Sequence, residues 1–233
     1  MKLGIFTDSH YSSQELTCGK RYNSRSLEKI AAALAHFRNA GCNLVLCLGD
    51  LIDREDSHAL EMQNLRAVAA VLDGTEGPVL VLRGNHDGFC FTEEEFYGIL
   101  GESHRPRDLT LGNQTFLFLD ACFTSDGNPY HPEGNHDWTD TWLPDTEALR
   151  ARLAAVPGKA VVCLHQNIDP NIREDHRLKN AAEVRKILEQ SGRVHLVLQG
   201  HYHPGTENTH NGIRYTTFPA MCEGDGNVYI IEL

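Results

Sequence analysis

The sequence has little positive charge and no long apolar segment. It contains 21 Lys and Arg residues against 32 Asp and Glu residues, which gives a formal net charge of −11. Nucleic-acid backbones and anionic membranes attract basic surfaces, so we expect neither as a partner, although bound metal ions can still attract a small anionic substrate. No apolar stretch reaches the roughly 18 residues of a membrane span, and the first residues lack the apolar region of a signal peptide. We therefore expect a cytoplasmic protein, whose oligomeric state the sequence leaves open.

Cysteine pairs are also missing from the sequence. The seven cysteines are odd in number, scattered in spacing and without a C-x-x-C pair. Several lie inside apolar runs, as Cys47 does in NLVLCLG and Cys163 does in AVVCLH. This pattern predicts reduced, buried thiols and not a disulfide framework.

Short apolar runs alternate with helix-like stretches, and no internal repeat or low-complexity segment interrupts them. Strands are predicted over residues 2–7, 43–49, 78–84, 114–121, 159–165 and 194–200, and helices over residues 26–41, 57–72, 92–101, 144–156 and 181–192. Residues 121–143 are rich in Gly, Pro, Asn and Asp and predict a long loop, while N-G and D-G turns in the tail predict hairpins. Because no linker divides the 233 residues, we expect a single α/β domain over residues 1–233 that ends in antiparallel strands.

Potential metal ligands follow five of these predicted strands. They are Asp8 and His10 after the first strand, Asp50 after the second, Asn85 after the third, His165 after the fifth, and His201 and His203 after the sixth. Taken singly, each has an ordinary explanation, such as a helix cap for Asp50 or a hydrogen-bonded strand end for His165. Ligands of open α/β sheets bind at the carboxyl ends of the strands, so we expect the set to converge on one edge.

The types and the number of these ligands predict two metal ions. Carboxylate, imidazole and amide oxygen suit divalent Mn, Fe, Zn, Co or Ni, and they predict no thiolate site. Seven ligands are more than one ion needs, and one carboxylate can bridge two ions. Two ions about 3.5–4 Å apart can clamp the attacking and leaving oxygens of a displacement at phosphorus, with a shared hydroxide as the nucleophile.

The motifs D-S-H, G-D-L-I-D, G-N-H-D, a lone His and G-H-Y-H, in this order from residue 8 to residue 203, resemble the calcineurin-like metallophosphoesterase superfamily. The resemblance implies a four-layer α/β/β/α sandwich, in which two mixed β-sheets are flanked by helices and the metal site lies at the C-terminal ends of strands. It assigns Asp8, His10 and His203 to one metal, Asn85, His165 and His201 to the other, and Asp50 to the bridge between them. His86 matches the histidine that contacts substrate and assists the leaving group. Asp53 and Asp87 match acidic positions near that histidine, with a role as surface or capping acids as the alternative.

A second stretch, C-G-K-R-Y-N-S-R-S over residues 18–26, is similar to the manganese-dependent ADP-ribose/CDP-alcohol diphosphatases within that superfamily. The sequence departs from that group at His10, where the group tends to carry Gln. The resemblance makes Arg21, Tyr22 and Arg25 candidates for substrate binding, with a solvated helix start as the alternative. We expect Trp138 and Trp142 in the long loop to pin the loop to the core, with stacking on a base or sugar as the alternative.

These observations predict a dinuclear metal-dependent phosphohydrolase. We expect it to cleave phosphodiester or diphosphate bonds of a small phosphorylated or nucleotide-like substrate. A phosphomonoesterase or protein phosphatase is the alternative activity, and a catalytically silent metal-binding scaffold is the alternative from another class. A metallopeptidase is disfavoured because no H-E-x-x-H motif occurs.

Overall fold

A computed structural model describes residues 1–134 and 137–233, and its strands form two mixed sheets. The first sheet has the order β10-β1-β2-β3, and the second has the order β4-β5-β6-β7-β9-β8. The strands are β1 (Lys2–Phe6), β2 (Leu44–Cys47), β3 (Val79–Val81), β4 (Leu109–Leu111), β5 (Gln114–Leu119), β6 (Lys159–Leu164), β7 (Val194–Gln199), β8 (Thr206–His210), β9 (Ile213–Thr217) and β10 (Tyr229–Glu232). Strands β1, β2 and β3 are parallel, as are β5, β6, β7 and β9, while β10, β4 and β8 run antiparallel at the outer edges.

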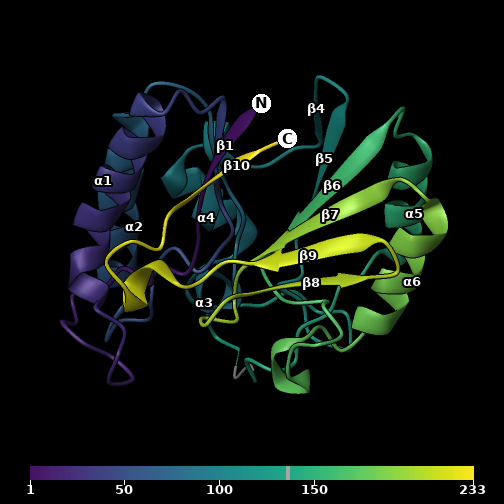
Figure 1. The fold of residues 1–233 in the computed structure, drawn as a ribbon. Helices are drawn as coiled ribbons and strands as arrows, with labels where there is room; N and C mark the ends of the chain where they lie inside the picture. Colours follow the sequence, from purple (N-terminus) through teal and green to yellow (C-terminus); the bar gives the residue numbers. More distant parts are fainter. Residues whose placement is uncertain (135–136) are drawn as a thin grey trace.

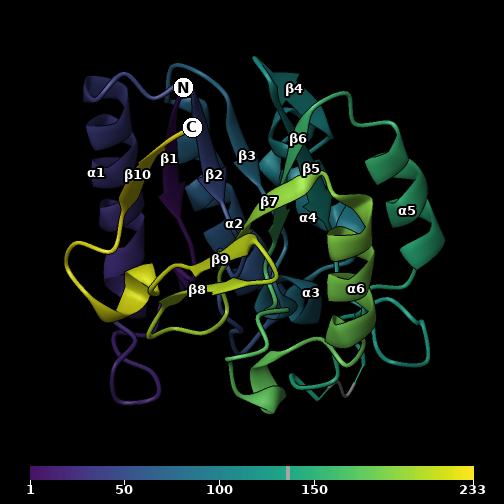
Figure 2. The ribbon, with the colours of Figure 1, turned by 45° about the vertical axis from the view of Figure 1, so that its right-hand side comes forward.

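Helices cover the outer faces of both sheets (Figures 1 and 2). The helices of the chain are α1 (Ser26–Asn39), α2 (His58–Asp73), α3 (Asn85–Cys90), α4 (Glu93–Leu100), α5 (Thr146–Ala154) and α6 (Ala181–Ser191), and the described part also has the short 3₁₀ helices η1 (Asn23–Arg25), η2 (Glu102–His104), η3 (Glu174–His176) and η4 (Met221–Glu223). Helices α1, α2 and α4 pack on the first sheet, and α5 and α6 pack on the second. This is the predicted four-layer α/β/β/α sandwich.

Strand β1 shows how the sequence fills the layers. Successive side chains of a strand point to opposite faces. Leu3 and Ile5 therefore enter the apolar layer between the two sheets, and Phe6 enters the layer beneath the helices. Gly4 also faces the helices, where a Cβ would lie only 2.4 Å from the ring of Phe37. The missing side chain at Gly4 lets α1 lie close against β1.

The tail was predicted only in part. The Asn211–Gly212 turn joins β8 and β9 as an antiparallel hairpin, and both turn residues have positive φ, as a tight hairpin turn requires. The predicted hairpin at Asp225–Gly226 is wrong, because the chain leaves the second sheet after β9 and β10 pairs with β1 in the first sheet. The tail therefore passes from one sheet to the other, as the yellow trace in Figure 1 shows.

Two further elements were missed, and one predicted loop is largely present. Strand β4 and helix α3 are short, with three and six residues, too few for a periodic pattern. The predicted loop 121–143 contains no helix or strand among its described residues, and its residues 135–136 lie outside the described part of the chain. Within residues 1–134 and 137–233, no helix combines the length and the apolar character needed to cross a bilayer.

Candidate metal and active site

The predicted ligands converge where the strands of both sheets end, at the end of the molecule opposite the two termini (Figure 1). Two glycines make this convergence possible. A Cβ on Gly84 would lie 2.1 Å from Asp50 Oδ1, and a Cβ on Gly200 would lie 2.2 Å from Thr7 Oγ1 and 2.7 Å from Asp8 Oδ2. Any larger residue would push the loops apart, so glycine before Asn85 and before His201 lets the first and second sheets share one site.

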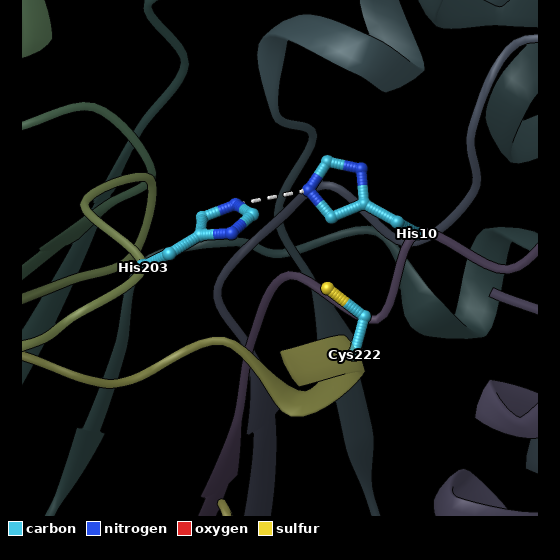
Figure 3. Close-up of side chains that lie close together, drawn as sticks. All are labelled: His10, His203 and Cys222. Atoms are coloured by element: carbon cyan, nitrogen blue, oxygen red, sulfur yellow. Dashed lines mark hydrogen bonds between the residues drawn. The ribbon is translucent and has the colours of Figure 1, made fainter. Parts of the chain in front are cut away.

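One cluster contains Asp8, His10 and His203. The Nε2 atoms of the two histidines lie 3.2 Å apart, as the dashed line in Figure 3 shows. Asp8 Oδ1 lies 3.3 Å from His203 Nε2 and 3.8 Å from His10 Nε2. The ligand atoms of His10 and His203 also lie close to the Cys222 sulfur. The lone pairs of these nitrogen and oxygen atoms would repel one another at such distances. A cation or bound protons between the atoms would remove this repulsion.

A second cluster contains Asp50, His165 and His201, whose ligand atoms lie within 4.8 Å of one another. Asp50 Oδ2 lies 3.2 Å from His165 Nε2 and 3.5 Å from His10 Nε2, so this one carboxylate oxygen reaches both clusters. Asn85 is buried beside them and lines the same cleft. Asp50 therefore lies between the two groups, and the division of the seven residues between two ions stays a prediction.

Four buried atoms in these clusters have no hydrogen-bond partner in the described part of the chain: Asp8 Oδ1, His10 Nδ1, Asn85 Oδ1 and His165 Nε2. Unpaired buried polar atoms are costly and rare. His165 Nδ1 lies 2.7 Å from the carbonyl of Leu48 and must donate to it, so Nε2 is the nitrogen that can bind an ion once it carries no proton. A carboxylate oxygen, an amide oxygen and an imidazole nitrogen that are all unpaired fit a divalent metal centre.

The carboxylates and imidazoles of the clusters also shift the pKa values of one another. Burial would lower the pKa of His165, but the charges of Asp50 and Asp8 raise it to about 9. Burial, together with the charge of His86, lowers the pKa of His10 to about 4. Burial would raise the pKa of Asp50, but its histidine neighbours hold it well below the usual range. The cluster therefore favours ionised carboxylates, which is the form that binds metal.

Backbone strain gathers at the same residues. The described chain has six non-glycine residues with positive φ, and four of them are predicted ligands: Asp8 (51°), His10 (45°), Asp50 (51°) and His201 (66°). The left-handed conformation is unfavourable for a residue with a Cβ. Such strain persists where the surrounding structure imposes it, and it clusters at functional sites.

His86 lies beside the clusters and is oriented by Asp53. His86 Nδ1 lies 2.8 Å from Asp53 Oδ1, and the backbone N–H of His86 donates to Asp50 Oδ1 at 2.9 Å. Burial would lower the pKa of His86, but the charges of Asp50 and Asp53 and the hydrogen bond to Asp53 raise it. His86 could also complete a metal cluster with His10 and Asp50. Because Asp53 occupies Nδ1, only Nε2 remains for a substrate or an ion.

Asp87 does not share this position, which corrects the catalytic role predicted for it. Its carboxylate is fully buried and accepts from the backbone N–H groups of Gly84, Leu51 and Ile52 at 2.8–3.2 Å. It is not among the residues that line the cleft. Asp87 therefore ties the loop after β2 to the loop after β3 and has no free oxygen directed at a substrate.

The three predicted substrate-binding residues separate in space. Arg21 lines the cleft, and its Nη1 lies 3.6 Å from Asp53 Oδ2. Tyr22 and Arg25 are exposed and do not line it, which corrects their predicted placement at the mouth of the site. Arg25 instead pairs with Asp225 at 3.3 Å and lies near the ring of Tyr22. Only Arg21 of the three is placed to meet a substrate.

A cleft of about 610 Å³ is lined by four of the cluster residues, Asp50, Asn85, His201 and His203. Trp138 lines this cleft and is 40% exposed, so the prediction that it pins the loop to the core is wrong. Its ring packs edge-on against His176, with 5.1 Å between the centroids, and lies 5.8 Å from His201. These contacts fix the ring at the cleft and leave part of its surface open.

Two site residues were missed by the sequence analysis. Glu223 pairs closely with His203 Nδ1, and Lys20 Nζ lies 3.0 Å from the same Glu223 oxygen. Cys222 is fully buried next to His10 and His203 (Figure 3). Both residues lie on η4, on the crossing between the two sheets. Their position in the site depends on the crossing of the chain between the sheets, which the predicted hairpins did not include.

Solved structures share this fold. A dimetal phosphatase from Danio rerio superposes with a TM-score of 0.78 at 19% identity, covering 95% of this chain and 88% of that one. A phosphopantetheinyl hydrolase from Mycobacterium tuberculosis gives 0.56 at 13% identity, with 94% and 89% covered. An archaeal phosphodiesterase gives 0.50 at 12% identity, with 95% and 86% covered. At these identities the likeness concerns the fold.

The sandwich and the ligand clusters at its strand ends define a metal-dependent phosphoester hydrolase. A profile of calcineurin-like phosphoesterases matches residues 1–205, and the chain belongs to this family. The family uses a dinuclear divalent metal site, for which this chain has candidate ligand groups. A comparison with curated proteins finds no significant match.

Proposed function

We propose that this chain hydrolyses a phosphodiester or diphosphate bond in a small nucleotide-like substrate. The observation that carries the proposal is the cleft of about 610 Å³, which is lined by Asp50, Asn85 and His86 together with Arg21 and Trp138. This volume lies within the range of about 300–1,000 Å³ that is usual for sites of small ligands. It leaves room for a substrate larger than the phosphate at the base.

In this proposal Asp8, His10 and His203 hold one divalent ion, Asn85, His165 and His201 hold the other, and Asp50 is shared. When bound, such ions neutralise phosphate oxygens and lower the pKa of bound water. Neutral His165 and ionised Asp50 are the ligand forms, so the protons of the metal-free cluster leave when ions bind.

His86 supplies the proton for the leaving oxygen. Asp53 holds Nδ1, so Nε2 is the nitrogen that meets the substrate. The carboxylate of Asp53 at Nδ1 favours the protonated ring, which is the form that can donate. Asp53 itself is fixed by Asn23 Nδ2 at 3.1 Å, so its role is to hold the ring of His86 in orientation.

Arg21 and Trp138 account for the substrate class. The Arg21 Nε–H is buried and has no hydrogen-bond partner in the described part of the chain. A guanidinium with free N–H groups is suited to a second phosphate, because its planar fork matches phosphate oxygens. An exposed indole can stack on a base. A phosphate group and a base beyond the attacked phosphorus are the parts of a nucleotide diphosphate.

The test is a substrate panel. The protein is loaded with Mn²⁺ and assayed on ADP-ribose, dinucleotides, cyclic nucleotides, sugar phosphates and p-nitrophenyl phosphate. We expect the highest kcat/KM for a nucleotide diphosphate or diester. A preference for phosphomonoesters over every diester and diphosphate would contradict the proposal and favour a phosphomonoesterase.

Replacing Arg21 tests its contact with the remote part of the substrate. We expect Arg21→Ala to lower kcat/KM for ADP-ribose. The loss of transition-state stabilisation should be about 2–3 kcal/mol, since a charge-assisted hydrogen bond to phosphate is lost. The loss should be much smaller with p-nitrophenyl phosphate, because a group that binds the remote half of a substrate contributes little to a truncated one. Steady-state kinetics on both substrates measure the difference.

Arg25→Ala is the matched control, because Arg25 is an arginine of the same segment that does not line the cleft. The change in kcat/KM that it causes should correspond to less than about 0.5 kcal/mol for either substrate. An equally small effect of Arg21→Ala on both substrates would remove the support for a diphosphatase. An equally large effect on both would instead mean that Arg21 acts through Asp53 and His86.

A further inference from the structure

We infer that the Cys222 thiol is an additional metal ligand in the His10–His203 cluster and makes this position selective for softer divalent ions such as Co²⁺, Zn²⁺ and Cd²⁺. The inference rests on the proposed metal centre and adds a thiolate, which the sequence analysis did not predict. Cys222 Sγ and one nitrogen each of His10 and His203 lie within 4.8 Å of one another. In Figure 3 the sulfur points toward the gap between the two rings.

These distances allow a shared ion. Zinc lies about 2.0–2.1 Å from imidazole nitrogen and about 2.3 Å from thiolate sulfur, so ligand atoms on opposite sides of one ion can be more than 4 Å apart, and the observed separations are compatible with a shared ion. Asp8 supplies an independent indication of a cation at this place. Its Oδ1 is buried, lacks a hydrogen-bond partner in the described part of the chain and lies 3.3 Å from His203 Nε2.

The backbone holds Cys222 in this position. The N–H of Cys222 donates to the carbonyl of Asp8 at 3.1 Å, and the N–H of Ala220 donates to the carbonyl of His203 at 3.0 Å. On the other side, Lys29 Nζ donates to the carbonyls of Met221 and Gly224 at 3.1 and 2.7 Å. The segment is therefore bound to the loops that carry two of the ligands, so the thiol cannot move away without disturbing them.

Two other thiols, those of Cys18 and Cys122, differ from Cys222 in their surroundings. Cys18 lines the same cleft but is exposed, and Cys122 is buried with its thiol directed at the carbonyl of Gly84 at 3.1 Å. Coordination at Cys222 would release the thiol proton to solvent and leave a thiolate on the ion. Thiolate is a soft ligand, and it favours Zn²⁺, Cd²⁺ and similar ions over Mn²⁺.

The test uses Co²⁺ as a spectroscopic probe. The 233-residue chain is stripped with a chelator and reloaded with Co²⁺, and its near-ultraviolet absorption is recorded together with its cobalt content. We expect a thiolate-to-cobalt charge-transfer band in the native protein and in Cys18→Ser, the matched control. The band should be absent in Cys222→Ser, a replacement of nearly the same size that preserves packing.

Metal competition provides the second readout. Cys222→Ser and Cys222→Ala should bind Cd²⁺ on the order of 10- to 100-fold more weakly than the native protein, while Mn²⁺ affinity changes little. A native protein that binds two cobalt ions per chain without the band would overturn the inference and leave the proposed function intact. Persistence of the band in Cys222→Ser would also overturn it. Failure to bind cobalt at all would overturn both the inference and the proposed metal centre.

Discussion

Replacing Asp50 with Ala should remove both metal ions and lower turnover on the order of 10³-fold or more. Asp50 Oδ2 is the carboxylate oxygen within 3.5 Å of both His10 Nε2 and His165 Nε2, so both clusters lose an anionic ligand together. The loss should match or exceed the usual effect of removing a charge-stabilising group from an active site. Elemental analysis of the purified variant measures metal content, and a phosphodiester assay measures turnover.

Two companion variants make the Asp50 result specific. Asp50→Asn preserves shape and one oxygen, and it should retain one ion weakly. Asp225→Ala removes a carboxylate whose side chain is 76% exposed and which does not line the cleft, so it should retain both ions and full turnover. Two ions per chain in Asp50→Ala would show that Asp50 does not bridge them.

Replacing His86 with Ala should preserve both ions but lower turnover by about 10²–10⁴-fold, the usual contribution of a positioned acid or base. The backbone N–H of His86, and not its side chain, donates to Asp50, so the metal clusters should survive the substitution. The loss should shrink with p-nitrophenolate as the leaving group, because this oxygen needs little protonation. Kinetics on good and poor leaving groups, with metal analysis in parallel, measure both effects.

Metal content decides between the two roles that the geometry of His86 allows. Loss of an ion in His86→Ala would make His86 a ligand together with His10 and Asp50. An equal loss of turnover for good and poor leaving groups, with both ions present, would mean that His86 positions the substrate and does not donate a proton. His58→Ala is a suitable control, since His58 pairs with Glu61 outside this cleft.

The ligand set could be predicted because it follows from local sequence. Apolar runs mark the strands, chain direction brings the ends of parallel strands to one edge, and polar residues at those ends must meet there. Cys222 and Glu223 could not be found in this way. They reach the site on a chain crossing from β9 to β10, and the pairing of β10 with β1 depends on contacts between residues more than 200 positions apart.

The orientation of side chains in short turns was equally hidden. Arg21 and Tyr22 are neighbours in sequence, yet Arg21 faces the cleft and Tyr22 lies exposed outside it. The backbone bond from Tyr22 N–H to the carbonyl of Cys222 and the 3₁₀ turn that follows set this direction. The sequence shows that basic and aromatic residues are neighbours in this segment. Only the tertiary contacts determine which of them lines the cleft.

The left-handed backbone at the predicted ligands implies a conflict between the stability of the fold and its activity. An L-residue in this conformation costs about 1–2 kcal/mol more than glycine. Asp8→Gly should therefore have a higher free energy of unfolding than Asp8→Ala by about this amount, although both lack the carboxylate; chemical denaturation of the two metal-free variants measures the gap. Selection for heat resistance alone would favour glycine at Asp8, His10, Asp50 and His201. The chain keeps the less stable residues at these positions because glycine has no side chain that could bind a metal ion.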